Sequence, residues 1–196
     1  MTAGEVVKEA LKDRVFYEES GGGVTFSGGE PLVQARFLLG LLEACRAEGL
    51  HTAVDTCGYA PREDLLACAA RTDLFLYDLK LMDEKRHREY TGVSNVAILE
   101  NLEALARAGA RIWLRVPLIP GLNDAPEQLG ALASYAASVS GIEQVNLLPY
   151  HETGIGKFQR LGKTYRLGGI GSPTKKRMEE AAERFRAVGL TVKTGG

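Results

Sequence analysis

Apolar positions along the chain follow two alternating patterns. In some segments they recur every three or four residues, as at Leu38, Leu41, Leu42 and Cys45, which is the spacing of a helix with one buried face. Between such segments lie short apolar runs, such as 74–80, that end in charged residues. This alternation predicts an α/β fold built from βαβ units, with parallel strands in a sheet and helices outside it.

The expected elements follow one another closely. A first helix begins at the capping-box sequence after Met1 and ends before Ser20. The expected strands are 24–26, 51–56, 74–80, 111–117 and 144–151, with a candidate terminal strand at 190–193. Helices are expected between them, and a polar connection is expected through His87, Arg88 and Tyr90. Residues 152–173 show no period and are expected to form a long functional loop.

Composition limits the function classes. With 196 residues and 45% hydrophobic content, the chain can form one domain, 1–196. Its net charge of -1 argues against nucleic-acid binding. No apolar run approaches the roughly 20 residues of a membrane span and no signal peptide is evident, so a cytoplasmic protein without a membrane partner is expected. The three cysteines, Cys45, Cys57 and Cys68, are too few for a disulfide framework and form no CxxC pair.

Polar residues stand at the end of each of the first five expected strands. They are Gly28, Gly29 and Glu30 after the first, Asp55 and Thr56 at the second, Asp78 and Lys80 at the third, Arg115 with Asn123 and Asp124 at the fourth, and His151 at the fifth. In parallel α/β sheets, ligands bind beyond the carboxyl ends of the strands. We therefore expect Glu30, Asp55, Asp78, Lys80, Arg115 and His151 to face one cavity there. The glycines would bring bare backbone close to a small ligand with a cationic group.

Each of these residues also has a structural explanation that involves no ligand. Glu30 can be a solvated charge in the first turn of a helix, and Asp55 can cap one. Asp78 and Lys80 can form a structural ion pair. Arg115 can be a solvated strand-end charge and His151 a hydrogen-bonded core residue. Their common placement at strand ends favours a binding site over five independent explanations.

Several motifs carry a resemblance that covers nearly the whole chain. They are the segment 20–31 with its GGEP, the DTCGY of 55–59, the YDLK of 77–80, the YTGVSN of 90–95, the segment 117–124 and the LLPYH of 147–151. In this order they resemble the activating enzymes of glycyl radical enzymes, whose best-known member is pyruvate formate-lyase activating enzyme. These are anaerobic oxidoreductases of the radical S-adenosylmethionine (SAM) type, with a partial (β/α)6 barrel related to the TIM barrel.

The resemblance implies a cofactor, an activity and partners. Such enzymes cleave SAM reductively and use the 5′-deoxyadenosyl radical to remove a hydrogen atom from a glycine of a partner glycyl radical enzyme. The electron for this cleavage comes from a [4Fe-4S] cluster. Reduced flavodoxin or ferredoxin donates the electron to the cluster. The segment 152–173 would be a natural place for selectivity between partners.

The resemblance also assigns roles to single residues. Gly28, Gly29 and Glu30 match the segment that receives the amino group of SAM. Asp55, Thr56 and Asp78 match positions that hold a monovalent cation beside the SAM carboxylate. Asp78 and Lys80 match a DxK motif near SAM and the incoming glycine, which makes them the candidate catalytic residues. Arg115 and His151 match positions that line the SAM pocket.

The sequence departs from the family in one large respect, because the cluster-binding CxxxCxxC motif is absent. The expected barrel therefore lacks its first strand and cluster loop, and the chain as given is expected to be inactive. Either it is the core of a longer protein, or it is a chain without the redox centre; its cleanly capped first helix favours the first. Two other functions stay open: a non-catalytic barrel that binds SAM or a partner, and a metal-dependent barrel enzyme with Glu30, Asp55, Asp78 and His151 as ligands.

Overall fold

The computed structural model describes residues 2–151 and 169–195. Six parallel strands form one sheet in the order β1-β2-β3-β4-β5-β6, so every strand pairs with its neighbour in the sequence. They are β1 Val24–Phe26, β2 Thr52–Thr56, β3 Leu74–Asp78, β4 Ile112–Leu118, β5 Ile142–Pro149 and β6 Val192–Thr194. Within the described chain β1 and β6 form the two edges and do not pair with each other, so the sheet is open.

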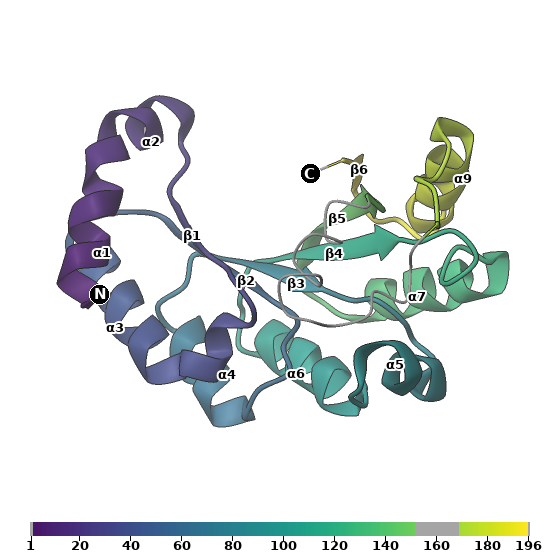
Figure 1. Ribbon diagram of the computed structural model, residues 1–196, viewed down its shortest axis with the longest axis horizontal. Coiled ribbons are helices and arrows are strands. Elements are labelled where there is room, and N and C mark those ends of the chain that lie inside the picture. Colours follow the sequence, from purple (N-terminus) through teal and green to yellow (C-terminus); the bar gives the residue numbers. More distant parts are fainter. Residues whose placement is uncertain (1, 152–168, 196) are drawn as a thin grey trace.

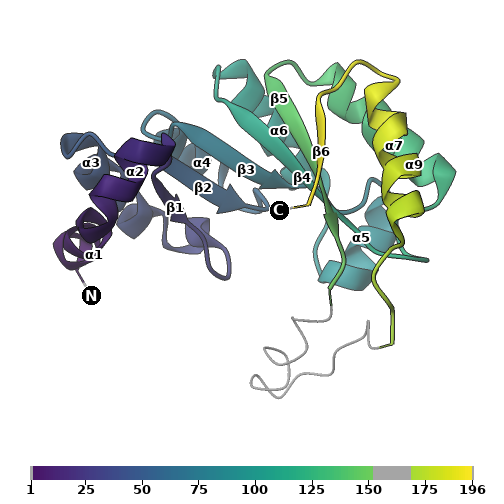
Figure 2. The same cartoon turned by 90° about the horizontal axis from the view of Figure 1, so that it is seen from above.

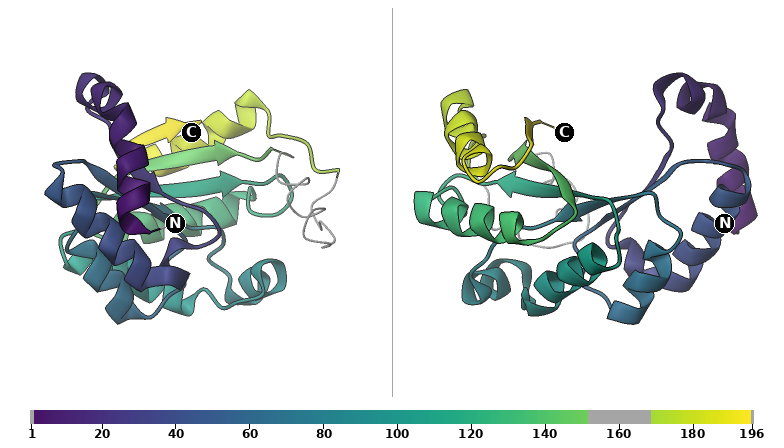
Figure 3. Two further views of the ribbon diagram at one scale, coloured as in Figure 1. Left: turned by 60° about the vertical axis from the view of Figure 1, so that its left-hand side comes forward. Right: turned by 180° about the vertical axis from the view of Figure 1, so that it is seen from behind.

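Helices cover one face of this sheet. They are α1 Ala3–Ala10, α2 Arg14–Ser20, α3 Ala35–Ala47, α4 Arg62–Ala69, α5 Glu84–Thr91, α6 Val96–Arg107, α7 Pro126–Ser138 and α9 Lys175–Arg186, with short 3-10 helices η1 Leu11–Asp13 and η2 Pro31–Gln34. Figure 1 shows α3, α4, α6 and α7 on the same side of the curved sheet, and the view from behind in Figure 3 agrees. The view from above in Figure 2 looks onto the other face, which no described helix covers and which we call the inner face.

Alternation along the strands separates the two faces. In β4, Ile112, Leu114, Val116 and Leu118 are fully buried toward the helices, whereas the residues between them are only half-buried. Burying such a side chain completely contributes roughly 1.5–3 kcal/mol. The core between sheet and helices thus fixes the register, and the register places Arg115 on the inner face.

Two helical segments differ from the sequence expectation. The first helix is not continuous to Ser20, because the 3-10 turn η1 separates α1 from α2. The connection after β3 is polar as expected, but it contains a helix that was not expected, α5. Its first turn is capped by the Asp83 side chain, which accepts from Arg86 N at 2.7 Å. His87 is the one buried residue of α5, so the sequence offers no apolar stripe by which to predict that helix.

The carboxyl-terminal part agrees with the expected order. Thr174 caps α9, and β6 supplies the terminal strand, displaced by a residue or two from the expected 190–193. Most of the expected loop 152–173 lies outside the described residues. Over the described ranges, every helix is too short or too polar to cross a bilayer.

Candidate functional site

The inner face carries a row of charged side chains where β2 and β3 end beside the middle of β4. Asp78 is the register partner of Arg115 on the next strand, and Asp55 pairs with Leu76 two residues before Asp78. Residues paired in register point to the same face of a sheet, and residues two apart do so as well. All three charged side chains therefore share the uncovered inner face.

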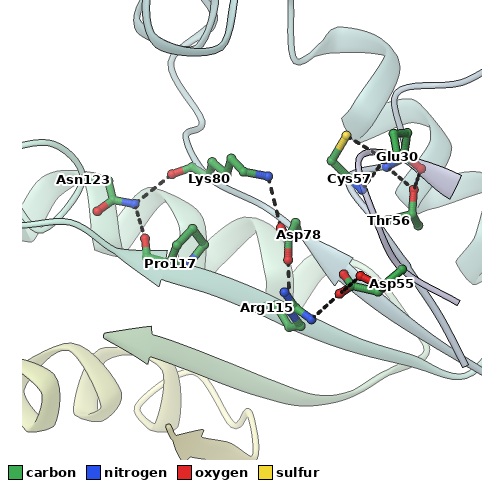
Figure 4. A network of polar contacts seen from close by, with 11 residues as sticks. Glu30, Asp55, Thr56, Cys57, Asp78, Lys80, Arg115, Pro117 and Asn123 are labelled. Carbon is green, nitrogen blue, oxygen red and sulfur yellow. Dashed lines mark hydrogen bonds and ion pairs between the residues drawn. The ribbon is translucent and has the colours of Figure 1, made fainter. Parts of the chain in front are cut away.

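Arg115 joins the two aspartates. Its Nη1 donates to Asp55 Oδ2 at 2.8 Å, and its Nε lies 3.0 Å from Asp78 Oδ1 (Figure 4). Lys80 Nζ donates to Asp78 Oδ2 at 3.2 Å, and Ser27 Oγ donates to Asp55 Oδ2 at 3.0 Å. The aspartate and arginine side chains are only 19–24% exposed. Two carboxylates, a guanidinium and an ammonium thus form a nearly neutral, partly desolvated network.

One contact in this network is imperfect. Arg115 Nε and Asp78 Oδ1 are both buried, and although they lie at ion-pair distance they do not align as a hydrogen bond. Neither atom has another hydrogen-bond partner among the described residues. Buried polar atoms without an aligned partner are rare in cores and common in sites that complete their bonds with a ligand.

Glu30 belongs to a second cluster beside this network. Its Oε1 accepts from the Thr56 hydroxyl at 2.6 Å and from Leu32 N at 3.2 Å. Its Oε2 accepts from Cys57 N at 2.9 Å and from Cys57 Sγ at 3.0 Å. The carboxylate is therefore already bonded to its own chain at both oxygens, and it fixes the loop after β1 to the loop after β2 (Figure 4).

Burial and Glu30 both disfavour the thiolate of Cys57. Removal from water, and then the hydrogen bond to the Glu30 carboxylate, raise the pKa of the Cys57 thiol to about 11. Sequence reasoning assigned Cys57 and Ser27 no role, although their positions next to Thr56 and Gly28 were a usable signal.

The glycines between the two clusters present open backbone. Gly28 has a φ of 139°, which side-chain-bearing residues rarely adopt, and both Gly28 and Gly29 are exposed. A Cβ at either position would meet no atom within 4 Å. The backbone here is free to approach a ligand.

Asn123 fixes the loops on the other side of the network. Its side-chain Nδ2 donates to Lys80 O at 3.0 Å and to Pro117 O at 2.7 Å, and its Oδ1 accepts from Ile119 N at 2.8 Å. Asn123 is only 3% exposed, and its bond to the Lys80 carbonyl fixes the backbone of Lys80. The neighbouring Asp124 forms an ion pair with Arg177 of α9 instead of facing the site.

The structure thus joins four of the six expected residues directly. Asp55, Asp78, Lys80 and Arg115 form one network, while Glu30 lies in the adjacent cluster. His151 is exposed, and its Nδ1 lies 3.2 Å from Ser172 Oγ, which belongs to neither group of contacts. The convergence of all six on one cavity stays a prediction.

Comparison with known proteins identifies the family. The sequence model described as Radical SAM superfamily matches residues 1–133. The chain belongs to the radical SAM superfamily. A trans-4-hydroxy-L-proline dehydratase activating enzyme from Clostridioides difficile is 43% identical over 98% of this radical SAM chain, which spans 64% of that relative. A pyruvate formate-lyase-activating enzyme from Clostridium pasteurianum is 37% identical over 92% of the chain and 75% of that protein.

A solved structure supports the same placement. The radical SAM chain superposes with a TM-score of 0.76 on a domain of pyruvate-formate lyase-activating enzyme from Bacteroides vulgatus, at 33% identity over 89% of this chain and 99% of that one. The open six-stranded sheet and this likeness confirm the expected partial barrel. The resemblance to activating enzymes of glycyl radical enzymes is confirmed as well.

SAM, which the superfamily implies, fits the residues at the carboxyl face. SAM carries an ammonium, a sulfonium and a carboxylate, so its site needs both acceptors and donors. Asp55 and Asp78 supply acceptors on the inner face, Lys80 supplies a donor that is 36% exposed, and Gly28 supplies open backbone.

A [4Fe-4S] cluster does not fit the cysteines of this chain. Cys45 on α3 and Cys68 on α4 are 0% and 1% exposed, packed in the core between helices and sheet. Burial raises the pKa of the Cys68 thiol to about 11 and raises that of Cys45 as well. A cluster needs several thiolates close together, whereas only Cys57 lies near the carboxyl face.

A monovalent cation bound by three side chains is also a poor fit. The Thr56 hydroxyl donates to Glu30 and accepts from Gly58 N at 2.9 Å. Thr56 pairs in register with the fully buried Tyr77, which places its side chain on the helix-covered face, opposite Asp55. Its side chain therefore offers no ligand to an ion on the inner face.

Proposed function

We propose that this chain is the SAM-binding barrel of an activating enzyme for a glycyl radical enzyme. The observation that carries the proposal is the network of Asp55, Asp78, Lys80 and Arg115 on the uncovered inner face, where β2 and β3 end beside the middle of β4. In a member of the radical SAM superfamily this is where SAM is expected. In this proposal residues 1–196 form one domain.

Each residue has a role in the proposal. The exposed backbone at Gly28 and Gly29, with Asp55 and Asp78, receives the ammonium and sulfonium of SAM. Lys80 donates to the carboxylate. Glu30 acts indirectly, because its oxygens are bonded to Thr56, Leu32 and Cys57, and it holds the glycine loop in place.

Two further residues complete the pocket. Arg115 fixes the aspartates from the side of β4, and His151 at the exit of β5 lines the far side. Asp78 and Lys80 also face the glycine-bearing segment of the partner, which makes them the candidates to act on catalysis. SAM supplies the 5′-deoxyadenosyl group that takes the hydrogen atom from that glycine.

The activity of a whole activating enzyme requires more than these residues. Reductive cleavage of SAM needs the cluster, fed by reduced flavodoxin or ferredoxin, and the cysteines of this chain do not fit one. The proposal for the chain alone is therefore binding of SAM and of the partner segment. A metal-dependent barrel enzyme is not favoured, because both oxygens of Glu30 are bonded to its own chain and the described residues contain no group of three or more His, Cys, Asp or Glu placed to hold a metal ion.

Calorimetric titration with SAM and with S-adenosylhomocysteine tests the proposal. The homocysteine compound lacks the sulfonium charge, so it is expected to bind more weakly than SAM. Asp78→Asn is expected to weaken SAM binding about tenfold or more, about 1.4 kcal/mol, because it removes a partly desolvated negative charge. Glu19→Gln, which removes an exposed carboxylate of α2, is the matched control and leaves binding unchanged.

Three results would count against the proposal. The first is no detectable SAM binding at millimolar concentration. The second is equal affinity of Asp78→Asn and the unchanged chain. The third is tight binding of Mg²⁺ or Zn²⁺ that depends on Asp55 and Asp78, which would favour the metal-dependent alternative.

A further inference from the structure

Two carboxylates on adjacent strands share one guanidinium. Asp55 Oδ2 and Asp78 Oδ1 lie 2.8 Å and 3.0 Å from nitrogens of Arg115. Since all three side chains are less than a quarter exposed, water screens their charges only partly. Without a cation between them, the two carboxylates would repel each other across β2 and β3.

The position between the carboxylates is therefore already filled by a side chain. Figure 4 shows the guanidinium of Arg115 between Asp55 and Asp78, with Lys80 on the other oxygen of Asp78. The Thr56 hydroxyl, which would be a third side-chain ligand for an alkali cation, is turned to the other face and bonded to Glu30. On the inner face the carboxylates left for such a cation are those of Asp55 and Asp78, and both of them already contact Arg115.

We propose that Arg115 is a built-in counterion, which in the ligand-free chain does the work of an alkali cation at Asp55 and Asp78. The formal charges support this, since two carboxylates are balanced by Arg115 and Lys80 without any bound ion. Na⁺ or K⁺ can occupy this position only where the guanidinium leaves it. The inference concerns the ligand-free chain, so it stands or falls independently of SAM binding.

Arg115 is also a positioning residue in this account. It comes from the middle of β4 and contacts carboxylates from β2 and β3, so it ties three adjacent strands together. Its removal leaves one carboxylate charge uncompensated in a partly buried place. An alkali cation is then the simplest replacement.

Thermal unfolding in different salts tests the inference. The melting temperature is measured in choline chloride, NaCl and KCl at equal ionic strength, so that general screening is constant. The unchanged chain is expected to melt at the same temperature in all three. Arg115→Gln is expected to melt lower in choline chloride and to regain about 2–4 °C or more in NaCl or KCl, which corresponds to about 1 kcal/mol.

Two variants separate charge from general destabilisation. Arg115→Lys keeps a cation at the position and is expected to show no alkali-specific effect. Arg107→Gln, which breaks an exposed ion pair with Glu103 on α6, is the matched control and is expected to respond equally to all three salts. Alkali-specific stabilisation of the unchanged chain, or its absence in Arg115→Gln, overturns the inference.

A second measurement covers the case in which Arg115→Gln does not fold. The double variant Asp55→Asn with Arg115→Gln removes one charge of each sign and is expected to fold and to ignore the choice of cation. Sodium-23 relaxation of the unchanged chain is expected to show no site-specific broadening. Broadening that Asp55→Asn abolishes would show a cation site already present and would overturn the inference.

Discussion

Thr56 donates its hydroxyl hydrogen to Glu30 at 2.6 Å, across 26 residues of chain. Thr56 ends β2 on the helix-covered face, whereas Glu30 follows the glycine loop after β1. The bond therefore holds the glycine loop from the helix-covered side of the sheet, whereas the Asp55 side chain lies on the inner face. It separates two tasks that the sequence alone assigns to one group: Glu30 shapes the loop, and the aspartates of the inner face remain for a ligand.

This bond has a measurable effect on stability. Thr56→Val removes the donor to Glu30 and the acceptor for Gly58 N, and Thr56 is 2% exposed, so water cannot replace either. We expect the free energy of unfolding to fall by about 2 kcal/mol. Urea unfolding measures it, and Thr56→Ser is expected to restore most of the loss. The same change at the exposed Thr25 of β1 is the control, and equal stability of the two valine variants would contradict the prediction.

A second prediction concerns Gly58, which lies in the loop after β2 and whose N–H donates to the Thr56 hydroxyl. Gly58 has a φ of 72°, and a Cβ there would overlap the ring and hydroxyl of Tyr77. Tyr77 cannot move away easily, because it is fully buried and its hydroxyl donates to Ile98 O at 2.6 Å.

Gly121 provides a matched control for this position. It has a similar φ of 76°, but a Cβ there would meet open space. Gly121→Ala is expected to carry only the cost of the left-handed backbone, about 1–2 kcal/mol, whereas Gly58→Ala adds about 1–3 kcal/mol of overpacking. Chemical unfolding of both variants checks this. Equal losses would mean that Tyr77 yields without cost.

A third prediction uses the Cys57 thiol. Its pKa is raised from 9.0 to about 11, by burial first and by Glu30 second, so at pH 8 it carries about 100-fold less thiolate than an ordinary cysteine. Alkylation by iodoacetamide, followed by peptide mass spectrometry, is expected to be slowed by that factor relative to the urea-unfolded chain. Glu30→Gln removes the negative charge and is expected to speed the reaction. An ordinary rate in the folded chain would contradict the contact with Glu30.

The raised pKa of Cys57 also predicts how the stability of the folded chain changes with pH. A thiol whose pKa is raised on folding keeps its proton more tightly in the folded chain than in the unfolded one. Its contribution to stability is therefore complete below pH 9 and is lost as the pH rises from 9 through about 11. Cys68, raised to about 11 by burial, acts in the same direction.

Much of the fold could be predicted because its signals are local. The apolar stripe from Leu38 to Cys45 and the buried runs of β3 and β4 report directly on burial. Helix α5 was missed because it is held by the cap at Asp83 and the single buried His87, neither of which produces a period. The break between α1 and α2 falls at Leu11–Asp13, where the sequence has no glycine or proline from which to predict it.

The site was predictable as a set of positions but not as a set of contacts. Strand-end placement correctly gathered Asp55, Asp78, Lys80 and Arg115, because parallel strands end at one edge. Alternation along β2 already places Thr56 opposite Asp55, but strand-end placement could not show that the Thr56 hydroxyl is bonded to Glu30. Nor could it show that both oxygens of the Glu30 carboxylate already accept hydrogen bonds from Thr56 and Cys57, because these bonds join residues 26 and 27 positions apart in the sequence.

The last prediction concerns iron, and it rests on counting ligands. A [4Fe-4S] cluster is held by cysteine thiolates that lie close together, whereas the three cysteines of this chain lie on α3, on α4 and in the loop after β2. Cys45 and Cys68 are packed in the core, and the thiol of Cys57 donates to Glu30. Reaching a shared cluster would require α3 and α4 to unpack from the sheet, which would expose the apolar side chains that hold the fold together.

We therefore expect the chain to fold without iron and to remain colourless after anaerobic treatment with iron and sulfide. Iron content, absorbance and circular dichroism check this, and SAM with dithionite is expected to yield no 5′-deoxyadenosine. Cys57→Ser is the control, because any iron held by the one cysteine near the carboxyl face would be lost with it, whereas the fold would not. SAM binding is expected to persist, since Asp55, Asp78 and Lys80 are in place without a cluster. A stoichiometric cluster with SAM turnover would show that the core cysteines are far more accessible than their packing indicates.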